Sequence, residues 1–273
     1  MKRIGAIRDA VVNCRIMTNS TGSGSRRIQS VEQAFDIIRY LREVDGATLS
    51  ETAEDMEMPV STAHIHLATL VDTDYVVKVG SEYRCSLRFL EMGGAMRDGM
   101  ALYRVAKPEL DELKEQTGEH TNVTVEQNGF AVQLYKAQSP ESIDDDAPLG
   151  DHLYLHSTAT GKAMLAERSR DEVDRIVDRR GLPALTDDTI TDRGALHEEL
   201  AAIRDRGYSI NRGEHYPGVC AVGTAIVSEP DDAVGAISIS GPMSRMEPER
   251  IEEELAPSLL NKKNIIELKI KQY

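Results

Sequence analysis

Small and hydroxyl-bearing residues in the segment 153–166 are the first that could bind a ligand. An apolar run there passes through a turn of small residues, Ser157 to Gly161, and continues as a helical pattern. Small residues allow backbone amides to approach a ligand, and a helix N-terminus favours an anion. The glycine spacing and the Lys-Ser/Thr ending of a phosphate-binding P-loop are absent. The segment is therefore typical either of a small-ligand site or of tight packing between a strand and a helix.

Two later segments place polar side chains beside apolar strands. Residues 207–219, which include Asn211, precede the apolar run 222–227. In residues 233–242, Ser238 and Ser240 alternate with apolar residues, so both belong to one face of the expected strand. These two hydroxyls could line a pocket or could lie on the solvent face of an edge strand.

The sequence shows no pattern typical of catalysis or metal binding. No nucleophile–base arrangement or carboxylate pair stands out, so we expect no catalytic residue, no cofactor and no enzymatic activity. His152 and His156 would lie about 13 Å apart on one strand, at roughly 3.3 Å per residue, which argues against a shared metal ion. The three cysteines are far apart and lack a CxxC pattern, which favours a cytoplasmic protein without disulfides or zinc. No apolar run is long enough to cross a membrane.

The elements before residue 90 have the order of a winged helix-turn-helix. A capping-box pattern at 30–33 begins a first helix, whose spaced apolar residues are Val31, Ala34, Phe35, Ile38 and Leu41. A second box at 48–51 begins another helix, and after a turn at 58–61 a third helix directs Ala63, Leu67 and Leu70 inward. A β-hairpin with its turn at Gly80-Ser81 follows, in the place of a wing.

The outward positions of the third helix are candidates for binding double-stranded DNA. These are Ser61, Thr62, Ile65, His66 and Thr69, with His64 at the margin. Hydroxyls and imidazoles can hydrogen-bond bases or phosphates, and Ile65 could contact a thymine methyl group. The hairpin adds Lys78 and Arg84, and a Ser/Gly-rich arm ending in Arg26 and Arg27 could enter a minor groove. The same three helices could instead contact other proteins.

The charge of the chain opposes this interpretation. The protein has 46 acidic and 32 basic residues, for a net charge of −14. Between Arg26 and Leu90, seven basic against eleven acidic residues leave a net charge of about −4, whereas DNA-binding domains are usually basic. Acidic residues spread over the whole chain are typical of proteins that work in concentrated salt. Counterion release contributes little to DNA affinity there, so we hypothesise that base contacts and burial supply it.

These patterns give four segments. Residues 1–25 form a flexible extension, and translation starts either at Met1 or at Met17. Residues 26–88 form the winged helix-turn-helix, and residues 89–106 form a linker helix. Residues 107–273 form an α+β domain with a mixed sheet and helices on its faces. Within it, Pro108 opens a helix to about residue 116, Asn128-Gly129 forms a hairpin turn, and the last helix covers about 247–260.

Five stretches, in this order, resemble the IclR family of transcriptional regulators, and the acidic composition resembles a haloarchaeal member. The resemblance covers about residues 26–270 and rests on residues 27–31, 61–64, 156–163, 189–191 and 238–242. It implies a winged helix-turn-helix, a linker helix and a GAF/profilin-like effector domain. It also implies a homodimer or homotetramer that binds an operator as repressor or activator. The implied effector is a small organic acid, sugar or aromatic catabolite.

The family's ligand pocket falls on a defined set of residues in this chain. With Gly161 from the small-residue turn, the candidate set is Ala159, Thr160, Gly161, Asn211, Ala221, Ser238 and Ser240. Three positions depart from the family pattern: Ile65 replaces a frequent arginine, Asn211 a frequent aspartate, and Gly213 the first acid of a usual Glu-Glu pair. The operator sequence and a preference for anions therefore do not carry over. A sensor that has lost DNA binding and uses its winged helix for protein contacts is the alternative, and an enzyme is a third reading.

Overall fold

The structure is a computed structural model that describes residues 27–139, 148–229 and 232–272. The chain divides into two compact units between Met96 and Arg97. The predicted flexible extension 1–25 and Arg26 lie outside the described residues.

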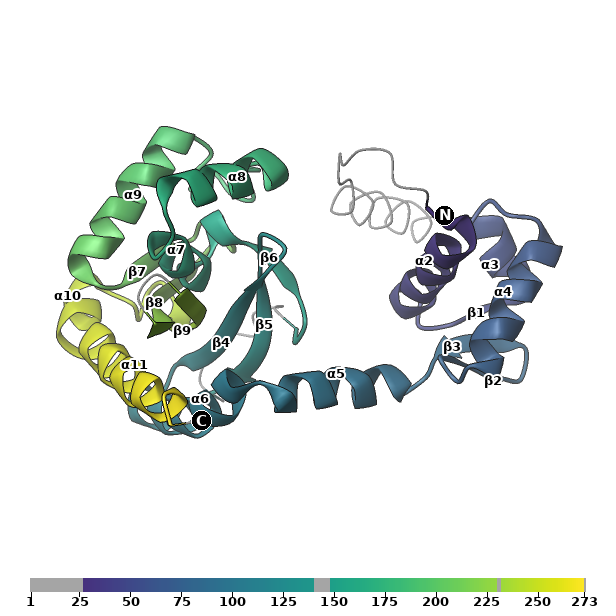
Figure 1. Ribbon diagram of the computed structural model, residues 1–273, viewed down its shortest axis with the longest axis horizontal. Helices are drawn as coiled ribbons and strands as arrows, with labels where there is room; N and C mark the ends of the chain where they lie inside the picture. The colour runs from purple at the N-terminus through teal and green to yellow at the C-terminus, as the bar shows by residue number, and fades with distance from the viewer. Residues whose placement is uncertain (1–26, 140–147, 230–231, 273) are drawn as a thin grey trace. The chain divides into compact units, whose positions relative to one another are not determined.

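The first unit contains a three-helix bundle and a small sheet (Figure 1). The helices α2 (Gln29–Glu43), α3 (Leu49–Asp55) and α4 (Val60–Asp72) precede the hairpin of β2 (Val76–Val79) and β3 (Glu82–Cys85). The strand β1 (Ala47–Thr48) pairs with β3, so the strand order is β1-β3-β2. Helix α5 (Arg88–Gly99) follows the hairpin and crosses the division between the units. The predicted helices and wing hairpin are therefore present.

The predicted capping boxes have different outcomes. At α3 the Thr48 side chain accepts a bond from the Glu51 amide, and the Glu51 side chain accepts one from the Thr48 amide, as predicted. The prediction at Ser30 is wrong, because α2 already begins at Gln29 and its N-cap, Ile28, makes no side-chain bond. Ser30 is thus inside the first turn and cannot act as the cap.

The buried face of α2 also differs from the prediction. Ile37, Tyr40 and Leu41 are buried in the core of the first unit, whereas Val31 and Phe35 remain 49% and 54% exposed. Two apolar stripes thus run along α2, and only one of them packs on α4 and the small sheet. The second stripe is left for another contact.

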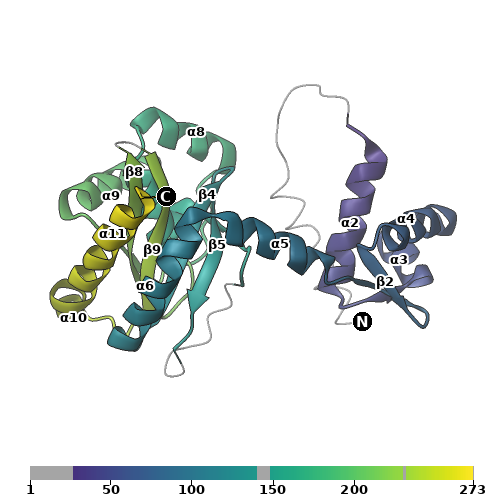
Figure 2. The ribbon, with the colours of Figure 1, turned by 60° about the horizontal axis from the view of Figure 1, so that its bottom comes forward.

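The second unit is a six-stranded sheet with helices on both faces (Figures 1 and 2). Its strand order is β6-β5-β4-β9-β8-β7. The strands are β4 (His120–Gln127), β5 (Phe130–Ala137), β6 (His152–Tyr154), β7 (Ser209–Arg212), β8 (Val219–Glu229) and β9 (Asp232–Pro242). Every described pairing is antiparallel, which corrects the prediction of a mixed sheet. Antiparallel pairing follows because β4–β5 and β8–β9 are joined by short turns.

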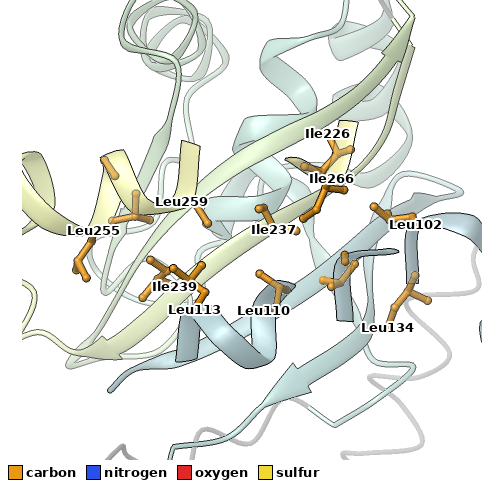
Figure 3. Close-up of a cluster of buried hydrophobic side chains, with 14 of the residues drawn as sticks. Leu102, Leu110, Leu113, Leu134, Ile226, Ile237, Ile239, Leu255, Leu259 and Ile266 are labelled. Atoms are coloured by element: carbon orange, nitrogen blue, oxygen red, sulfur yellow. The ribbon is translucent and has the colours of Figure 1, made fainter. Parts of the chain in front are cut away.

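One face of this sheet is covered by two long helices, α6 (Ala101–Thr117) and α11 (Ala256–Ile270), which lie side by side (Figure 2). Short helical segments, α10 (Pro248–Arg250) and a π-helical turn (Ile251–Leu255), lead into α11. Leu110, Leu113, Ile237 and Ile239 are among the fully buried residues of this core (Figure 3).

The opposite face is covered by α7 (Ala159–Ala166), α8 (Arg170–Arg180) and α9 (Arg193–Arg206). A 3-10 turn (Leu155–Ser157) leads from β6 into α7. Met164 and Leu165 of α7 pack with Leu196 and Leu200 of α9 in a second buried core. The side chains of the sheet therefore alternate between two cores, as a sheet with two covered faces requires.

Two helix predictions in the second unit are corrected. Pro108 does not open a helix: it lies inside α6, and the helical run from residue 88 breaks at Met100 instead. A proline within a helix removes only one backbone donor, and the buried residues on both sides of it keep α6 continuous. The last helix continues to Ile270, ten residues beyond the prediction.

Candidate functional site

A small cavity lies between the α7 face of the sheet and the beginning of α7. Its wall is formed by two rows of side chains on neighbouring strands. In the first row Asn211, Ala221 and Ser240 lie opposite one another, and in the second Ser238 lies opposite Asn122. Alternation along β9 directs Ile237 and Ile239 into the other core, so both serines face the cavity.

The cavity measures about 70 Å3. No Lys, Arg, Asp or Glu is found among the described residues that line it. The lining residues are Asn122, Gln133, Leu153, Thr158, Ala159, Thr160, Asn211, His215, Tyr216, Val219, Ala221, Ser238 and Ser240.

Glycine at position 223 allows α7 to begin close to the sheet. A Cβ there would lie 2.7 Å from the backbone carbon of Ala159, so any side chain would push the helix away. The neighbouring Ser209 hydroxyl donates to the Ala159 carbonyl at 2.5 Å and holds the start of the helix on β7. Close approach and this hydrogen bond together fix the helix end that closes the cavity.

The first amides of α7 are available to a ligand. The Thr158 hydroxyl caps the helix and accepts a bond from the Gly161 amide at 3.0 Å. The Ala159 and Thr160 amides precede the first residue that can bond within the helix, and neither has an acceptor among the described residues. Two donors at a helix N-terminus favour a negatively charged group.

Hydrogen bonds between side chains fix the polar wall. The Asn122 amide nitrogen donates to the Ser238 and Ser240 hydroxyls at 3.3 and 3.1 Å. The Gln133 amide nitrogen in turn donates to the Asn122 side-chain oxygen at 2.9 Å. Because both serine oxygens accept from Asn122, their hydroxyl protons are free to donate to a ligand.

Asn211 connects three parts of the site rather than standing free in it. Its amide nitrogen donates to the Ser157 carbonyl, and its side-chain oxygen accepts a bond from the Glu214 amide at 3.1 Å. It therefore joins β7 to the turn before α7 and to the loop 213–218. An aspartate at this position could not donate to the Ser157 carbonyl.

The loop 213–218 is anchored by a buried ion pair. Lys162, which is 1% exposed, donates to both carboxylate oxygens of Glu214 at 2.7 Å, and Glu199 lies 3.6 Å from the same ammonium group. Burial raises the pKa of Glu214, and the nearby Lys162 opposes this rise. The Thr189 hydroxyl also donates to the Glu214 carbonyl at 2.7 Å. The loop that carries His215 to the cavity is thus held from several sides.

Two histidines near the cavity are kept uncharged by burial. Burial lowers the pKa of His215, with Asp151 opposing and His156 adding to the effect. Burial also lowers the pKa of His156, whose Nε2 lies 3.1 Å from the Pro183 carbonyl. Within the described residues, no cluster of His, Cys, Asp or Glu is suited to a metal ion.

The structure brings together six of the seven residues predicted for the ligand site, and Gly161 is the exception. Its amide is taken by Thr158, and a Cβ at this position would lie 2.3 Å from the Leu155 carbonyl. Gly161 therefore serves close packing instead of lining the cavity. Asn122, Gln133 and His215 line the cavity but were not predicted, since sheet register and loop folding bring them there.

The residues predicted for DNA binding lie on α4 and the hairpin. Ser61, His64 and Ile65 are exposed on α4, and Thr69 is exposed although its hydroxyl donates to the Ile65 carbonyl. Thr62 and His66 are half-buried. On the hairpin, Lys78 and Arg84 are exposed, and Arg84 pairs with Glu82 at 2.8 Å. Arg27 is exposed and pairs with Glu32 at 3.4 Å, while Arg26 lies outside the described residues.

An apolar groove of about 790 Å3 lies along one side of α4 in the first unit. The second stripe of α2 lines it with Val31 and Phe35, and α5 contributes Met92 and Met96. Ile65 belongs to this groove, and His66 enters it with its Nε2 at 3.3 Å from the Gln33 side chain. The side of α4 that carries Ile65, His66 and Thr69 is therefore more apolar than the sequence suggested.

Comparison with known proteins relates both units to one family. Residues 30–80 match the IclR helix-turn-helix domain, and residues 94–266 match the bacterial transcriptional regulator IclR C-terminal domain. No described helix is long and apolar enough to span a membrane.

Relatives match over most of their length. A probable HTH-type regulator, ArcR of Halobacterium salinarum, is 29% identical over 90% of this chain and 95% of its own. The transcriptional repressor IclR of Escherichia coli is 30% identical over 86% of this chain and 87% of its own.

Solved structures share the arrangement of elements. IclR of Thermotoga maritima superimposes with a TM-score of 0.77 at 27% identity, over 90% of this chain and all of its own. An IclR homologue of Microbacterium hydrocarbonoxydans, solved with 4-hydroxybenzoate, gives 0.74 at 22% identity, over 89% of this chain and 98% of its own. The chain therefore belongs to the IclR family of ligand-responsive, DNA-binding transcriptional regulators.

Proposed function

We propose that the cavity at the start of α7 is the effector site and that the effector is a carboxylic acid of roughly two or three carbons. The observation that carries this proposal is the meeting of two free α7 amides with two serine hydroxyls whose oxygens already accept from Asn122. These groups donate hydrogen bonds toward one small volume. A carboxylate supplies the matching acceptors.

The size of the cavity narrows the effector classes that the resemblance implies. A volume of about 70 Å3 corresponds to roughly two or three water molecules at about 30 Å3 each. Sugars and aromatic acids are several times larger, so they would require the wall to open. The small organic acid is therefore the class that this cavity accommodates.

The effector proposal is tested by calorimetric titration of the full-length protein with propionate and with benzoate in molar KCl. We expect propionate to bind, and we expect binding to weaken about tenfold in a Ser240→Ala variant, which lacks one donor. Ser244→Ala removes an exposed hydroxyl four residues away and serves as the matched control. Binding of benzoate alone, or equal binding by both variants, would contradict the proposal.

For DNA, we propose that the exposed end of α4 and the wing contact the operator. Ser61, His64 and Ile65 are the outermost α4 residues near its N-terminus, and Lys78 and Arg84 extend from the wing. Arg26 and Arg27 are proposed to reach the neighbouring minor groove. Since the acidic unit offers few cations, affinity should depend weakly on salt.

The DNA proposal is tested by fluorescence anisotropy on the DNA just upstream of the protein's own gene, in low and in molar KCl. We expect specific binding to persist in molar salt and to fall in His64→Ala and Arg84→Ala variants. Arg175→Ala, on the exposed side of α8, is the control. Binding that is lost in molar salt, or that all three variants share equally, would contradict this surface.

We further propose that the protein works in the cytoplasm as a dimer, or a pair of dimers, whose contact is formed by the α2 and α5 residues of this groove, which leaves Ile65 of α4 to the operator. Val31, Phe35 and Met96 are each at least 49% exposed there, and an apolar surface of this extent marks an interface. A twofold axis would place the same groove on both partners. Sedimentation velocity should show dissociation for Phe35→Glu and none for Leu268→Glu, an exposed apolar residue on α11. An unchanged Phe35→Glu assembly would place the contact elsewhere.

A further inference from the structure

Among the described residues, His215 is the one imidazole that lines the cavity, and the position of its ring proton is argued from its neighbour Ser157. Ser157 has a single hydroxyl proton, which it donates to the Tyr154 carbonyl at 3.1 Å. The Ser157 oxygen also lies 3.0 Å from His215 Nδ1. We assign the serine proton to the Tyr154 carbonyl, so that the imidazole donates in the second contact and Nδ1 carries the hydrogen.

The other ring nitrogen, Nε2, is consequently an acceptor. In a neutral imidazole with its proton on Nδ1, Nε2 carries only a lone pair. Burial favours this neutral form, since it lowers the pKa of His215 against the opposing charge of Asp151. No hydrogen bond to Nε2 is found within the described residues. The imidazole that lines the cavity therefore carries an acceptor that no described residue uses.

We propose that His215 Nε2 accepts a hydrogen bond from a hydroxyl group of the effector and so selects hydroxy acids over keto acids and unsubstituted acids. This inference rests on the proposed role of the cavity as effector site. In a cavity of about 70 Å3, a carboxylate held by the α7 amides and by Ser240 leaves its neighbouring carbon within the same small volume as the His215 ring. A hydroxyl on that carbon offers the donor that Nε2 requires.

The alternatives to a hydroxyl are disfavoured for a physical reason. A keto oxygen would bring its lone pairs against the lone pair of Nε2, and a methylene group would leave Nε2 without any partner. An acceptor that a bound ligand leaves without a partner typically lowers affinity by about ten- to a hundredfold. Lys162 and Thr189 both hold Glu214 next to His215, and the contact of Nδ1 with Ser157 holds the ring itself.

Three acids of equal chain length test the proposal by calorimetric titration of the full-length protein. DL-lactate carries a hydroxyl, pyruvate a keto oxygen and propionate neither. We expect lactate to bind at least tenfold more tightly than the other two. In His215→Phe this preference should shrink to within about twofold, and His215→Gln, which offers an amide oxygen, should restore part of it.

Control measurements distinguish hydroxyl selection by His215 from the underlying proposal that the cavity is the effector site. His152→Phe alters an exposed histidine on β6 and should keep the lactate preference. Equal binding of the three acids, weakened by Ser240→Ala, would overturn the hydroxyl selection and leave the effector site intact. A preference that survives in His215→Phe and disappears in Gln133→Met would assign the acceptor to Gln133 and overturn the role of His215. No binding of any of the three acids would overturn both proposals.

An independent readout examines the imidazole itself. The 15N chemical shifts of His215 in the free protein should show a protonated Nδ1 and a bare Nε2, and lactate should shift Nε2 while propionate leaves it unchanged. A protonated Nε2 in the free protein would refute the argument at its first step.

Discussion

Replacing Lys162 by methionine should be the most damaging single change to the second unit that keeps side-chain length. The Lys162 and Glu214 side chains are 1% and 10% exposed, and their charged groups meet at 2.7 Å. Without the ammonium group, the buried Glu214 carboxylate keeps a hydrogen bond from the Arg212 amide at 3.4 Å. The nearby charge of Glu199 repels it. Breaking a buried pair on one side typically lowers the free energy of unfolding by about 3–5 kcal/mol.

The predicted loss can be measured by urea unfolding and by calorimetry in molar KCl. A loss of about 3–5 kcal/mol corresponds to a fall in melting temperature of roughly 6–20 °C for a unit of this size. The double variant Lys162→Met, Glu214→Gln removes the uncompensated charge and should recover more than half of the loss. The control Lys271→Met, at the exposed end of α11, should change stability little.

The dependence on pH gives a second check on the same reasoning. Burial already raises the pKa of Glu214, and without Lys162 nothing equivalent opposes that rise. A carboxyl whose pKa is higher in the folded than in the unfolded protein stabilises the fold below its unfolded pKa, and this contribution is lost as the pH rises. The deficit of Lys162→Met should therefore be larger at pH 8 than at pH 6. A loss below about 1 kcal/mol, or a deficit independent of pH, would refute the assignment of a stabilising buried pair.

Two further predictions concern local packing and histidine charge. Gly161→Ala places a Cβ 2.3 Å from the Leu155 carbonyl and should lower the free energy of unfolding by about 1–3 kcal/mol. The control Gly94→Ala places a Cβ that meets nothing within 4 Å and should be neutral or stabilising. Equal effects of the two substitutions would contradict the packing argument. Because burial lowers the pKa values of His156 and His215, the unfolded state binds more protons as the pH falls below about 6.5. Urea titrations should then show stability falling, by at most about 1.4 kcal/mol per pH unit for each histidine, and constant stability from pH 7 to 5.5 would contradict it.

Local signals in the sequence predicted the turns and most element positions. Thr48 and Glu51 form their capping box, and Asn128 and Gly129 adopt the positive φ values, 56° and 84°, of a tight hairpin turn. A capping box or a hairpin turn depends on about four neighbouring residues, so a short stretch of sequence is sufficient to predict it. The Pro108 prediction was wrong because the packing of α6 on the sheet outweighs a local preference.

The cavity was only partly predictable, because its members meet through the sheet. Ser238 and Ser240 could be assigned to one strand face from their alternation alone. Asn122, however, lies 116 residues from its partner Ser238, and nothing in either segment fixes the register that joins them. His215 reaches the cavity through a loop whose anchor, Lys162, is distant in sequence. Contacts of this range follow from strand order, which periodicity does not reveal.

The distribution of charge around the cavity fits the acidic composition of the chain. Lys162 is the cation of α7, yet Glu214 already neutralises it, and no charged side chain is found among the described lining residues. The anionic effector proposed above would therefore be held by amides and hydroxyls, and Thr158 and Asn122 fix the surrounding hydrogen bonds. Short-range hydrogen bonds are screened by salt less than contacts between exposed ions. The proposed site would therefore bind a carboxylate with little dependence on salt, as a sensor with a net charge of −14 would require if it works in concentrated salt.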